Sequence, residues 1–362
     1  MRSRAARICD VSVLGAGIAG LTATRALAGA GLSVRLHEAR DRVGGRLLSV
    51  THDGCTVDLG ASWFWPNEPL VQKLASELGV STFQQALAGD AMFEADHRGA
   101  HRMEGNPLDT VSGRFAQGAQ ALAVRLAERL PEGVLRLHDP VTRVHVNDGA
   151  VTVEAASGVT TARHVVVAIP PALAVEAITF SPELPAEVRN LAERTAVWMG
   201  DIVKAVAVFD KPYWRDVGLA GAAVSHRGPF REVHDHSGPG GSPAALLGFA
   251  AAAPFNGVSP ERIGAAFADQ LRRLFGAASA PPRHIHVTDW SAERYTSPRA
   301  ASPRAATTSY GHPLYQRATA GRIHWASTET SAQNAGHIEG ALWAGQQAAR
   351  AVLDAIEATQ AT

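Results

Sequence analysis

Residues 8–38 read ICDVSVLGAGIAGLTATRALAGAGLSVRLHE, and the residue pattern changes twice within this segment. A β-branched, apolar run over 8–14 stops at a glycine-rich turn, after which apolar residues recur at helical spacing until Gly29 and Gly31. A second apolar run over 33–37 ends at Glu38. The segment therefore predicts a strand, a tight turn, a helix and a second strand, which together form one βαβ unit.

The turn has the spacing GxGxxG in Gly15-Ala16-Gly17-Ile18-Ala19-Gly20. In a βαβ unit such glycines allow a tight turn, backbone access to a pyrophosphate and close packing of the helix on the sheet. Backbone N–H groups at the start of the helix then face the phosphates. Glu38, at the end of the next strand, is expected to accept from both ribose hydroxyls, which argues against a 2′-phosphate. The unit predicts a dinucleotide site.

The overall composition excludes several classes of protein. The chain has 362 residues, with 34 basic and 34 acidic side chains, and 46% of its residues are hydrophobic. Zero formal net charge provides no field that attracts nucleic acid or an anionic membrane, and no apolar run reaches the ~18 residues of a membrane span. Cys9 and Cys55 lie in strand-like runs and are expected to be reduced. We therefore expect a cytoplasmic protein without nucleic-acid or membrane partners.

Further along the chain, the periodicity predicts both helices and strands. Helices are expected over 70–78, 117–130, 259–275 and 339–358, and a β-meander over 134–138, 141–146 and 151–155. Other strands are expected over 163–169, 202–209, 284–289 and 323–326, whereas 84–113 is poorly patterned. The strand over 202–209 carries Lys204, which is costly to bury without a polar partner and would reach solvent only from an edge strand. Its position predicts a polar site next to this strand.

The residues after Glu38 distinguish flavin binding from nicotinamide binding. Glu38-Ala39-Arg40 is followed by Gly44-Gly45-Arg46, so two glycines and a guanidinium come just after the ribose carboxylate. There they can hold an extended ADP-ribityl chain. With this block the sequence resembles the flavin-containing amine oxidase family, which includes monoamine, polyamine and L-amino acid oxidases.

Other blocks resemble the same family in the same order along the chain. They are residues 58–63, which in the family run along the flavin, Val141, whose backbone meets adenine, the strand with Lys204, the segment of Trp290, and the closing blocks 323–330 and 336–341. The resemblance implies an α/β (α+β) fold. It has a Rossmann-like FAD-binding domain over 1–80, 113–180 and 285–362, and a discontinuous, smaller substrate domain over 81–112 and 181–284.

The resemblance also implies which residues form the site. Lys204, Trp290 and His337 are expected on the catalytic side, with Lys204 holding a water against flavin N5 and helping reoxidation by O₂. Glu329 is expected to accept from ribityl or ribose hydroxyls, and the start of the last helix to face the pyrimidine edge of the flavin. The residues expected to bind the cofactor are Gly15, Ala16, Gly17, Ile18, Ala19, Gly20, Glu38, Ala39, Arg40, Gly45, Arg46, Gly60, Ala61, Ser62, Trp63, Val141, Glu329, Gly336, His337 and Ile338.

The implied reaction is FAD-dependent oxidation of the C–N bond of a small amine. A hydride equivalent passes to flavin N5, the imine hydrolyses in water, and O₂ reoxidises the flavin and leaves H₂O₂. Two alternatives stay open at this stage. One is a flavin-dependent dehydrogenase or desaturase that acts on a C–C bond or uses an acceptor other than O₂, and the other is a catalytically silent flavin-binding protein.

The chain departs from the family in three respects. The segment 295–300 has no cysteine, so we expect noncovalent FAD. The two tyrosines of the family's aromatic cage align with Ala300 and His337. Four other side chains are candidates to replace the cage, although each is equally plausible in a core: Trp63, Trp65, Tyr295 and Tyr310. The chain is also short over about 84–113, so we expect a thinly covered pocket or one that a second subunit completes in a homodimer.

Two His-x-His pairs suggest metal ligands. His234 with His236 and His284 with His286 can each place two imidazoles on one face of a strand. Neither pair has an evident third ligand in the sequence, and a protein zinc site normally has at least three. We therefore expect no metal site.

Overall fold

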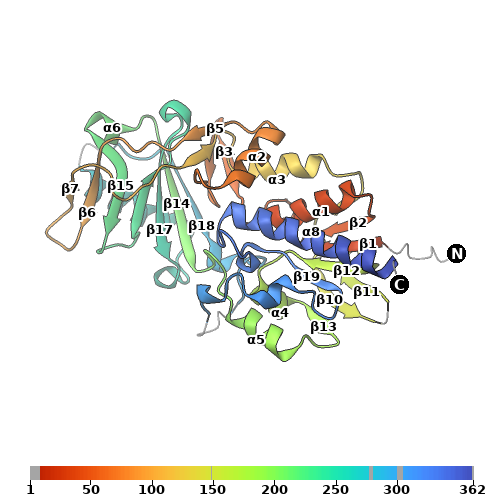
Figure 1. Ribbon diagram of the computed structural model, residues 1–362. Coiled ribbons are helices and arrows are strands. Elements are labelled where there is room, and N and C mark those ends of the chain that lie inside the picture. The colour runs from red at the N-terminus through yellow and green to blue at the C-terminus, as the bar shows by residue number, and fades with distance from the viewer. Residues whose placement is uncertain (1–8, 148, 277–279, 300–304, 361–362) are drawn as a thin grey trace.

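Two large β-sheets lie at opposite ends of an elongated molecule (Figure 1). The structure is a computed structural model that describes residues 9–147, 149–276, 280–299 and 305–360. The sheet that contains the first strand, together with the helices on its two faces, is called the nucleotide lobe below. The other sheet and its helices are called the second lobe.

The sheet of the nucleotide lobe has a parallel centre. β1 is parallel to both β12 and β2, and β19 is parallel to β12. The glycine turn therefore leaves the middle of the sheet at the carboxyl end of β1, which is where ligands bind to open parallel sheets. The strand order is β13 (Thr179–Ser181), β10 (Val141–Val146), β11 (Val151–Ala155), β12 (Gly158–Val167), β1 (Cys9–Leu14), β2 (Val34–His37) and β9 (Leu135–Arg136), and β19 (Ile323–Trp325) also pairs with β12.

Helices cover both faces of this sheet, because successive side chains of a buried strand point to opposite sides. Val166 of β12 packs into a core with α1 (Ile18–Gly29), α2 (Pro69–Leu78), α3 (Gln120–Glu128) and α8 (Ile338–Gln360). Val165 and Val167 face the other core, which contains residues of α4 (Pro171–Ala177) and α5 (Ala186–Arg194). Among the described residues, no helix combines the length and the apolar character that a membrane crossing needs.

The second lobe is a mainly antiparallel sheet covered by α7 (Pro260–Phe275), which buries Phe267 and Leu271. Its strand order is β18 (His284–Asp289), β14 (Ile202–Phe209), β17 (Ala244–Ala251), β16 (Glu232–Asp235), β15 (Leu219–Ser225), β6 (Asp90–Glu94) and β7 (His101–Met103). The short helix α6 (Tyr213–Asp216) contacts β15. Two separate ribbons pair β3 (Ser49–His52) with β4 (Cys55–Asp58), and β5 (Thr82–Gln84) with β8 (Gly113–Phe115). Short 3₁₀ turns span Pro239–Gly241, Ala253–Phe255, Trp290–Ala292, Thr307–Ser309, Pro313–Gln316 and Thr328–Thr330.

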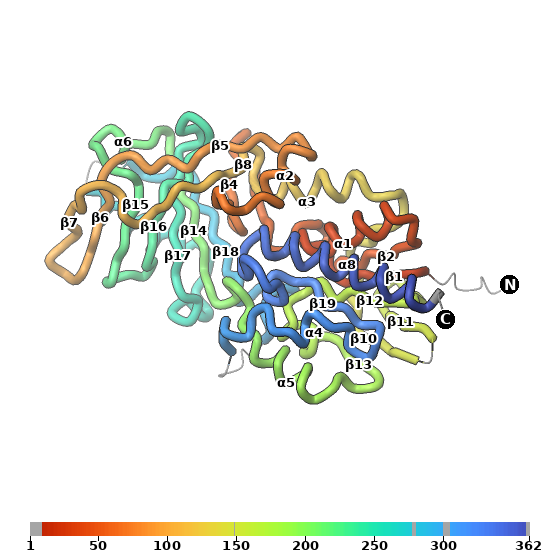
Figure 2. Tube along the Cα trace, in the orientation of Figure 1, coloured from red at the N-terminus to blue at the C-terminus, as the bar shows by residue number. Residues whose placement is uncertain are grey.

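The chain passes between the two lobes several times (Figure 2). After β5 it runs out to β6 and β7 at the far edge of the second sheet and returns to pair β8 with β5. The expected poorly patterned stretch over 84–113 is thus an excursion that adds two strands to the second sheet.

The structure confirms most of the expected helices and strands, and β14 and β18 have the expected bounds. The predicted meander is wrong at its first strand, because β9 pairs in parallel with β2 instead of joining β10. The expected domain boundaries also differ from the topology in two places. β18 pairs with β14 in the second sheet, and α5 packs into a core of the nucleotide lobe. The hydrophobic periodicity of a segment predicts whether it forms a strand or a helix, but it does not identify the strand or helix against which that segment packs.

Candidate active site

A cavity of about 1050 Å³ extends from the glycine turn after β1 to strands β14 and β17 of the second lobe. This volume is slightly above the ~300–1,000 Å³ that ligand pockets usually have. Of the predicted residues, only Ala16, Gly20 and Glu329 are absent from its wall. Those in the wall are Gly15, Gly17, Ile18, Ala19, Glu38, Ala39, Arg40, Gly45, Arg46, Gly60, Ala61, Ser62, Trp63, Val141, Lys204, Trp290, Gly336, His337 and Ile338.

The glycine turn opens the backbone towards this cavity. Gly17 precedes α1 with an ordinary φ of −66°, and a Cβ placed there would meet only the Gly44 carbonyl oxygen, at 4.0 Å. A Cβ at Gly20 would lie 1.9 Å from the Gly15 carbonyl oxygen. Gly17 therefore leaves space in front of the helix N-terminus, whereas Gly20 is required for packing of the turn against the helix.

Glu38 is held by backbone N–H groups at the same end of the cavity. Its Oε2 accepts from the Ala16 N–H at 2.7 Å, and its Oε1 accepts from the Arg40 N–H at 2.9 Å. The Arg40 guanidinium in turn donates to Glu293, with 2.7 Å between Nη2 and Oε2. These contacts orient a buried carboxylate at the end of β2, where a ribose is expected.

Arg46 lines the cavity and is held in place by Glu329, which is not part of the cavity wall. Its Nη1 and Nη2 donate to Oε1 and Oε2 of Glu329 at 2.6 and 3.0 Å. The Glu329 side chain is fully buried and also accepts from the Trp198 N–H at 3.2 Å. Burial would raise the pKa of Glu329, but the Arg46 guanidinium outweighs it and lowers that pKa. Glu329 thus positions Arg46 and is not part of the cavity wall, and its expected contact with ribityl or ribose hydroxyls stays a prediction.

Lys204 lies in the interior of the second sheet, between β18 and β17, and is 2% exposed. An edge strand open to solvent is therefore excluded for this residue. Its Nζ donates to the Gly60 carbonyl oxygen and to Ser62 Oγ, the latter at 3.3 Å. Burial lowers the pKa of Lys204 to about 7, although the nearby Asp58 opposes this shift. The polar site that the sequence predicts beside this strand consists of the Gly60 carbonyl oxygen and the Ser62 hydroxyl.

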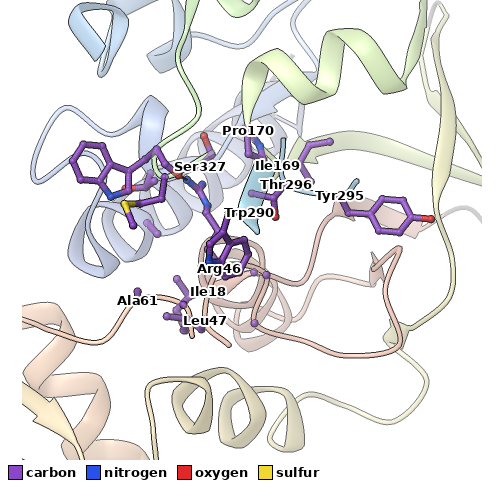
Figure 3. Close-up of a pocket in the computed structure, with 18 of the residues that line it drawn as sticks. Ile18, Arg46, Leu47, Ala61, Ile169, Pro170, Trp290, Tyr295, Thr296 and Ser327 are labelled. Carbon is purple, nitrogen blue, oxygen red and sulfur yellow. Dashed lines mark hydrogen bonds between the residues drawn. The ribbon is translucent and has the colours of Figure 1, made fainter. Parts of the chain in front are cut away.

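Trp290 holds the start of the same segment. The indole Nε1 donates to the Leu59 carbonyl oxygen at 3.0 Å, and the side chain is buried. Figure 3 shows Trp290, Arg46 and Ile18 gathered near the centre of the site, with Tyr295 and Ala61 on opposite sides of them. Lys204 and Trp290 therefore both hold the segment 59–62, on which the family resemblance places the flavin.

Three of the four candidate aromatic residues line the cavity, namely Trp63, Trp65 and Tyr295. Lys204 Nζ lies 5.5 Å from the centre of the Trp63 ring and 5.0 Å from that of Phe249. Tyr295 instead lies beside Arg40, at the Glu38 end of the cavity. Tyr310 donates to the Ala196 carbonyl oxygen and is not part of the wall. Ala300 falls outside the described residues.

Two groups of polar residues in or beside the cavity are missed by the sequence reasoning. Glu68 is 1% exposed, lies 2.5 Å from His337 Nδ1 and accepts from the Trp65 N–H at 3.0 Å. The His337 ring packs on Trp65, with 4.6 Å between ring centres. Glu68 directly precedes Pro69 at the start of α2, a position that usually predicts an exposed cap, so no local signal marks it as buried.

His234 and Asp109 form the second missed group. His234 Nδ1 lies 2.7 Å from Asp109 Oδ1, and both residues line the cavity. Burial would lower the pKa of His234, but Asp109 and Glu232 together raise it to about 9. The sequence indicated His234 only as one half of a possible metal pair. Its real partner comes from the excursion over 84–113, which no sequence period predicts.

The fold and the site together define a class of protein. A lobe whose sheet has a parallel centre and a glycine turn, joined by one long cavity to a second, mainly antiparallel lobe, is typical of two-domain oxidoreductases that bind a dinucleotide cofactor.

Comparison with known proteins identifies the family within this class. The chain matches the family of flavin containing amine oxidoreductases over residues 18–117 and 87–353. A protein of Mycobacterium tuberculosis assigned as flavin-containing monoamine oxidase AofH is 30% identical, over 95% of this chain and 96% of that protein. The putrescine oxidase of Kocuria rosea is 27% identical, over 96% of this chain and 95% of that protein. The chain belongs to the flavin-containing amine oxidase family and is a flavin-dependent oxidoreductase of small amines.

Solved structures show the same fold. Cyclohexylamine oxidase from Brevibacterium oxydans has a TM-score of 0.86 at 22% identity, over 97% of this chain and 100% of that chain. A putrescine oxidase bound to putrescine has a TM-score of 0.84 at 23% identity, over 96% of this chain and 99% of that chain. These relatives lend no support to a C–C dehydrogenase or to a silent flavin-binding protein.

Proposed function

We propose that the cavity binds FAD noncovalently and that the protein oxidises small amines with O₂ as electron acceptor. The observation that carries this proposal is the continuity of the cavity. One end has the glycine turn and Glu38, and the other has Lys204 between two aromatic rings. A dinucleotide that extends through the cavity would reach from the first group to the second.

The residues present fit an adenine dinucleotide. The open space at Gly17 leaves the helix N-terminus accessible to phosphates. His37, also in the wall, keeps Nδ1 2.7 Å from Asp139 and leaves a buried Nε2 without a partner among the described residues. Glu38 offers carboxylate oxygens to ribose hydroxyls, and Arg46 offers a guanidinium further along. These are the donors and acceptors that the nucleotide half of FAD needs.

The positions of the two cysteines support noncovalent binding. Cys9 lies in β1, where burial raises the pKa of its thiol to about 11, and Cys55 begins β4. Neither thiol lines the cavity. A covalent bond from either cysteine to a flavin in the cavity is therefore not part of the proposal.

The side chains of this protein would orient the cofactor and the amine and exclude water from the site. When bound, FAD supplies the acceptor for a hydride equivalent from the α-carbon of a neutral amine. Trp63 and Phe249 give the substrate end an apolar wall that excludes water, and Trp290 and Lys204 fix the segment 59–62 beneath it. With a pKa near 7, Lys204 carries a positive charge in a large fraction of molecules at neutral pH, and that charge favours electron transfer to O₂.

The first experiment is an absorption spectrum of the purified protein, followed by acid precipitation. We expect a flavin spectrum, with FAD released into the supernatant and none retained by the pellet. Peroxide release is then measured with putrescine, cyclohexylamine and benzylamine. A colourless protein that takes up no added FAD would overturn the cofactor proposal, and a yellow protein that releases no peroxide with any amine would overturn the oxidase proposal.

Lys204→Met tests the proposed role in reoxidation. Rapid-mixing measurements on the reduced protein should show a slower reaction with O₂, by about ten-fold or more, whereas reduction by the amine and FAD affinity change much less. An unchanged rate of reoxidation would reject this role for Lys204.

We also infer a cytoplasmic location and a homodimer that completes the thin cover over the site. The two unpaired cysteines support a reducing compartment. Cell fractionation tests the first inference. Sedimentation equilibrium tests the second, and a monomeric mass with full activity would count against it.

A further inference from the structure

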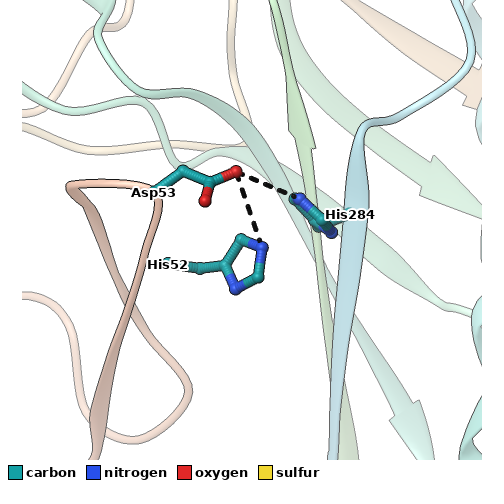
Figure 4. Close-up of side chains that lie close together, drawn as sticks. All are labelled: His52, Asp53 and His284. Carbon is teal, nitrogen blue, oxygen red and sulfur yellow. Dashed lines mark ion pairs between the residues drawn. The ribbon is translucent and has the colours of Figure 1, made fainter.

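We propose that His52, Asp53 and His284 form a binding site for one divalent transition-metal ion of the Zn²⁺ class (Figure 4). The three ligand atoms lie within 4.8 Å of one another. Asp53 Oδ2 is 3.6 Å from His52 Nε2 and 3.5 Å from His284 Nε2. Ligands about 2.0–2.1 Å from a tetrahedral zinc ion are roughly 3.4 Å apart, so these two spacings need little adjustment.

Two distant segments bring these ligands together. His52 ends β3, and the tight turn at Asp53 and Gly54 connects it to β4. His284 begins β18, and its ring centre lies 3.9 Å from that of His52. The sequence suggests His286 as the neighbour of His284 and gives no third ligand. The structure supplies two further candidate ligands from the hairpin instead, so the proposal departs from the expectation of no metal site.

The charged residues around the site are compatible with a bound cation. The Arg283 guanidinium lies 3.7 Å from Asp53, but its Nε also lies 3.5 Å from Asp210. When a metal ion takes the Asp53 carboxylate, Arg283 can keep Asp210 as its partner. The His52, Asp53 and His284 side chains are 47%, 58% and 40% exposed, so an ion and a completing water molecule can enter.

The donor set selects the class of ion. Two imidazoles and one carboxylate favour Zn²⁺, Co²⁺, Ni²⁺ or Cu²⁺ over Mg²⁺ and Ca²⁺, which prefer oxygen ligands. Three protein ligands leave one position for water. Cys55 follows in the same hairpin but does not belong to the group of ligand atoms.

The place of the site in the fold points to a structural role. β4 leads into the segment 59–62, and β18 leads into Trp290, which donates to the Leu59 carbonyl oxygen. The ion would thus join the far ends of two strands that are already linked beside the cavity. His284 precedes Trp290 by six residues of extended chain, or roughly 20 Å at ~3.3 Å per residue, so the ion takes no part in the reaction.

The test is Zn²⁺ binding by the full-length protein after treatment with a chelator and dialysis. Calorimetry should show one strong site per chain. At a free Zn²⁺ concentration of 100 times the Kd, the ratio of folded to unfolded protein should rise about 100-fold, which is seen as a higher unfolding temperature. Binding that leaves the unfolding temperature unchanged would overturn the structural role.

Variants assign the ligands. His52→Ala, Asp53→Asn and His284→Ala should each weaken Zn²⁺ binding by about ten-fold or more. His145→Ala, at an exposed histidine of β10 in the nucleotide lobe, should leave it unchanged. The Co²⁺-loaded wild-type protein should show the visible absorption bands of a low-coordinate site, which requires no variant to fold. The site would be refuted if the wild-type protein did not bind Zn²⁺ at millimolar concentration, or if all four variants bound it as tightly as the wild type. Either result is independent of whether the protein binds FAD.

Discussion

Burial and charge oppose one another at Lys204, and its titration follows from that balance. Burial lowers the pKa of the ammonium group from 10.5 to about 7, although Asp58 favours the charged form. The pKa of Asp58 is itself raised by burial. Lys204 is tolerated in the sheet because the Gly60 carbonyl oxygen and the Ser62 hydroxyl accept hydrogen bonds from its ammonium group.

This shift makes the stability of the protein depend on pH in a defined window. Between about pH 7 and pH 10.5 the unfolded chain holds a proton on Lys204 that the folded chain has lost, so the free energy of unfolding rises with pH. Below about pH 7 both states are protonated, and the slope from this group disappears. Lys204→Met should therefore gain stability relative to the wild type as the pH falls from 10.5 to 7. Urea unfolding at pH 7, 8, 9 and 10 measures the difference, and parallel curves would contradict the shift.

Glu329 is another buried charged residue beside the site. Glu329→Gln leaves Arg46 without an ionised partner, and we expect a loss of about 3 kcal/mol in the free energy of unfolding together with weaker FAD binding. Glu293→Gln is the matched control, because its ion pair with Arg40 is more exposed, with 35% of the Glu293 side chain accessible. That change should cost less than about 1 kcal/mol. Denaturant titration of both variants compares the two pairs, and equal losses would argue against Glu329 as the buried anchor of Arg46.

At the scale of elements, the turn between β1 and α1 contains one glycine that is needed for ligand binding and another that is needed for packing. The backbone at Gly17 is ordinary, and its missing side chain leaves space towards the cavity. The missing side chain at Gly20 is what lets the helix approach the turn. Two glycines of one motif are thus required for different reasons.

Single alanine substitutions should distinguish these reasons. Gly17→Ala is expected to leave the free energy of unfolding of the cofactor-free protein within about 0.5 kcal/mol of the wild type, while FAD affinity falls by at least about ten-fold. Gly20→Ala is expected to cost about 3 kcal/mol or to prevent folding, because its Cβ overlaps the Gly15 carbonyl oxygen. Denaturant unfolding and FAD titration check both, and full FAD affinity in Gly17→Ala would contradict pyrophosphate binding at this turn.

At the scale of the whole molecule, the cavity is formed by parts of the chain from Leu14 to Ala341 that belong to both lobes. A ligand that fills it contacts segments which are far apart in the unfolded chain. Binding therefore stabilises the folded molecule as a whole, through linkage.

FAD should accordingly raise the unfolding temperature in proportion to the logarithm of its free concentration. At 100 times the Kd, the free energy of unfolding should increase by about 2.7 kcal/mol. Thermal unfolding of the flavin-free protein over a series of FAD concentrations measures this, with Gly17→Ala as the control that should respond much less. A temperature that does not change with FAD would contradict binding in the cavity.

Local sequence determined the βαβ unit, the glycine turn, Glu38, and the strand that carries Lys204, because each depends on residues adjacent in the chain. Tertiary structure alone decided that Glu329 holds Arg46, that Glu68 meets His337, and that His284 faces the β3–β4 hairpin. It also placed β9 beside β2 and β18 in the second sheet. The periodicity of a segment records which of its faces is buried, but not which distant segment covers that face. Contacts between segments far apart in the chain therefore become visible only in the folded molecule.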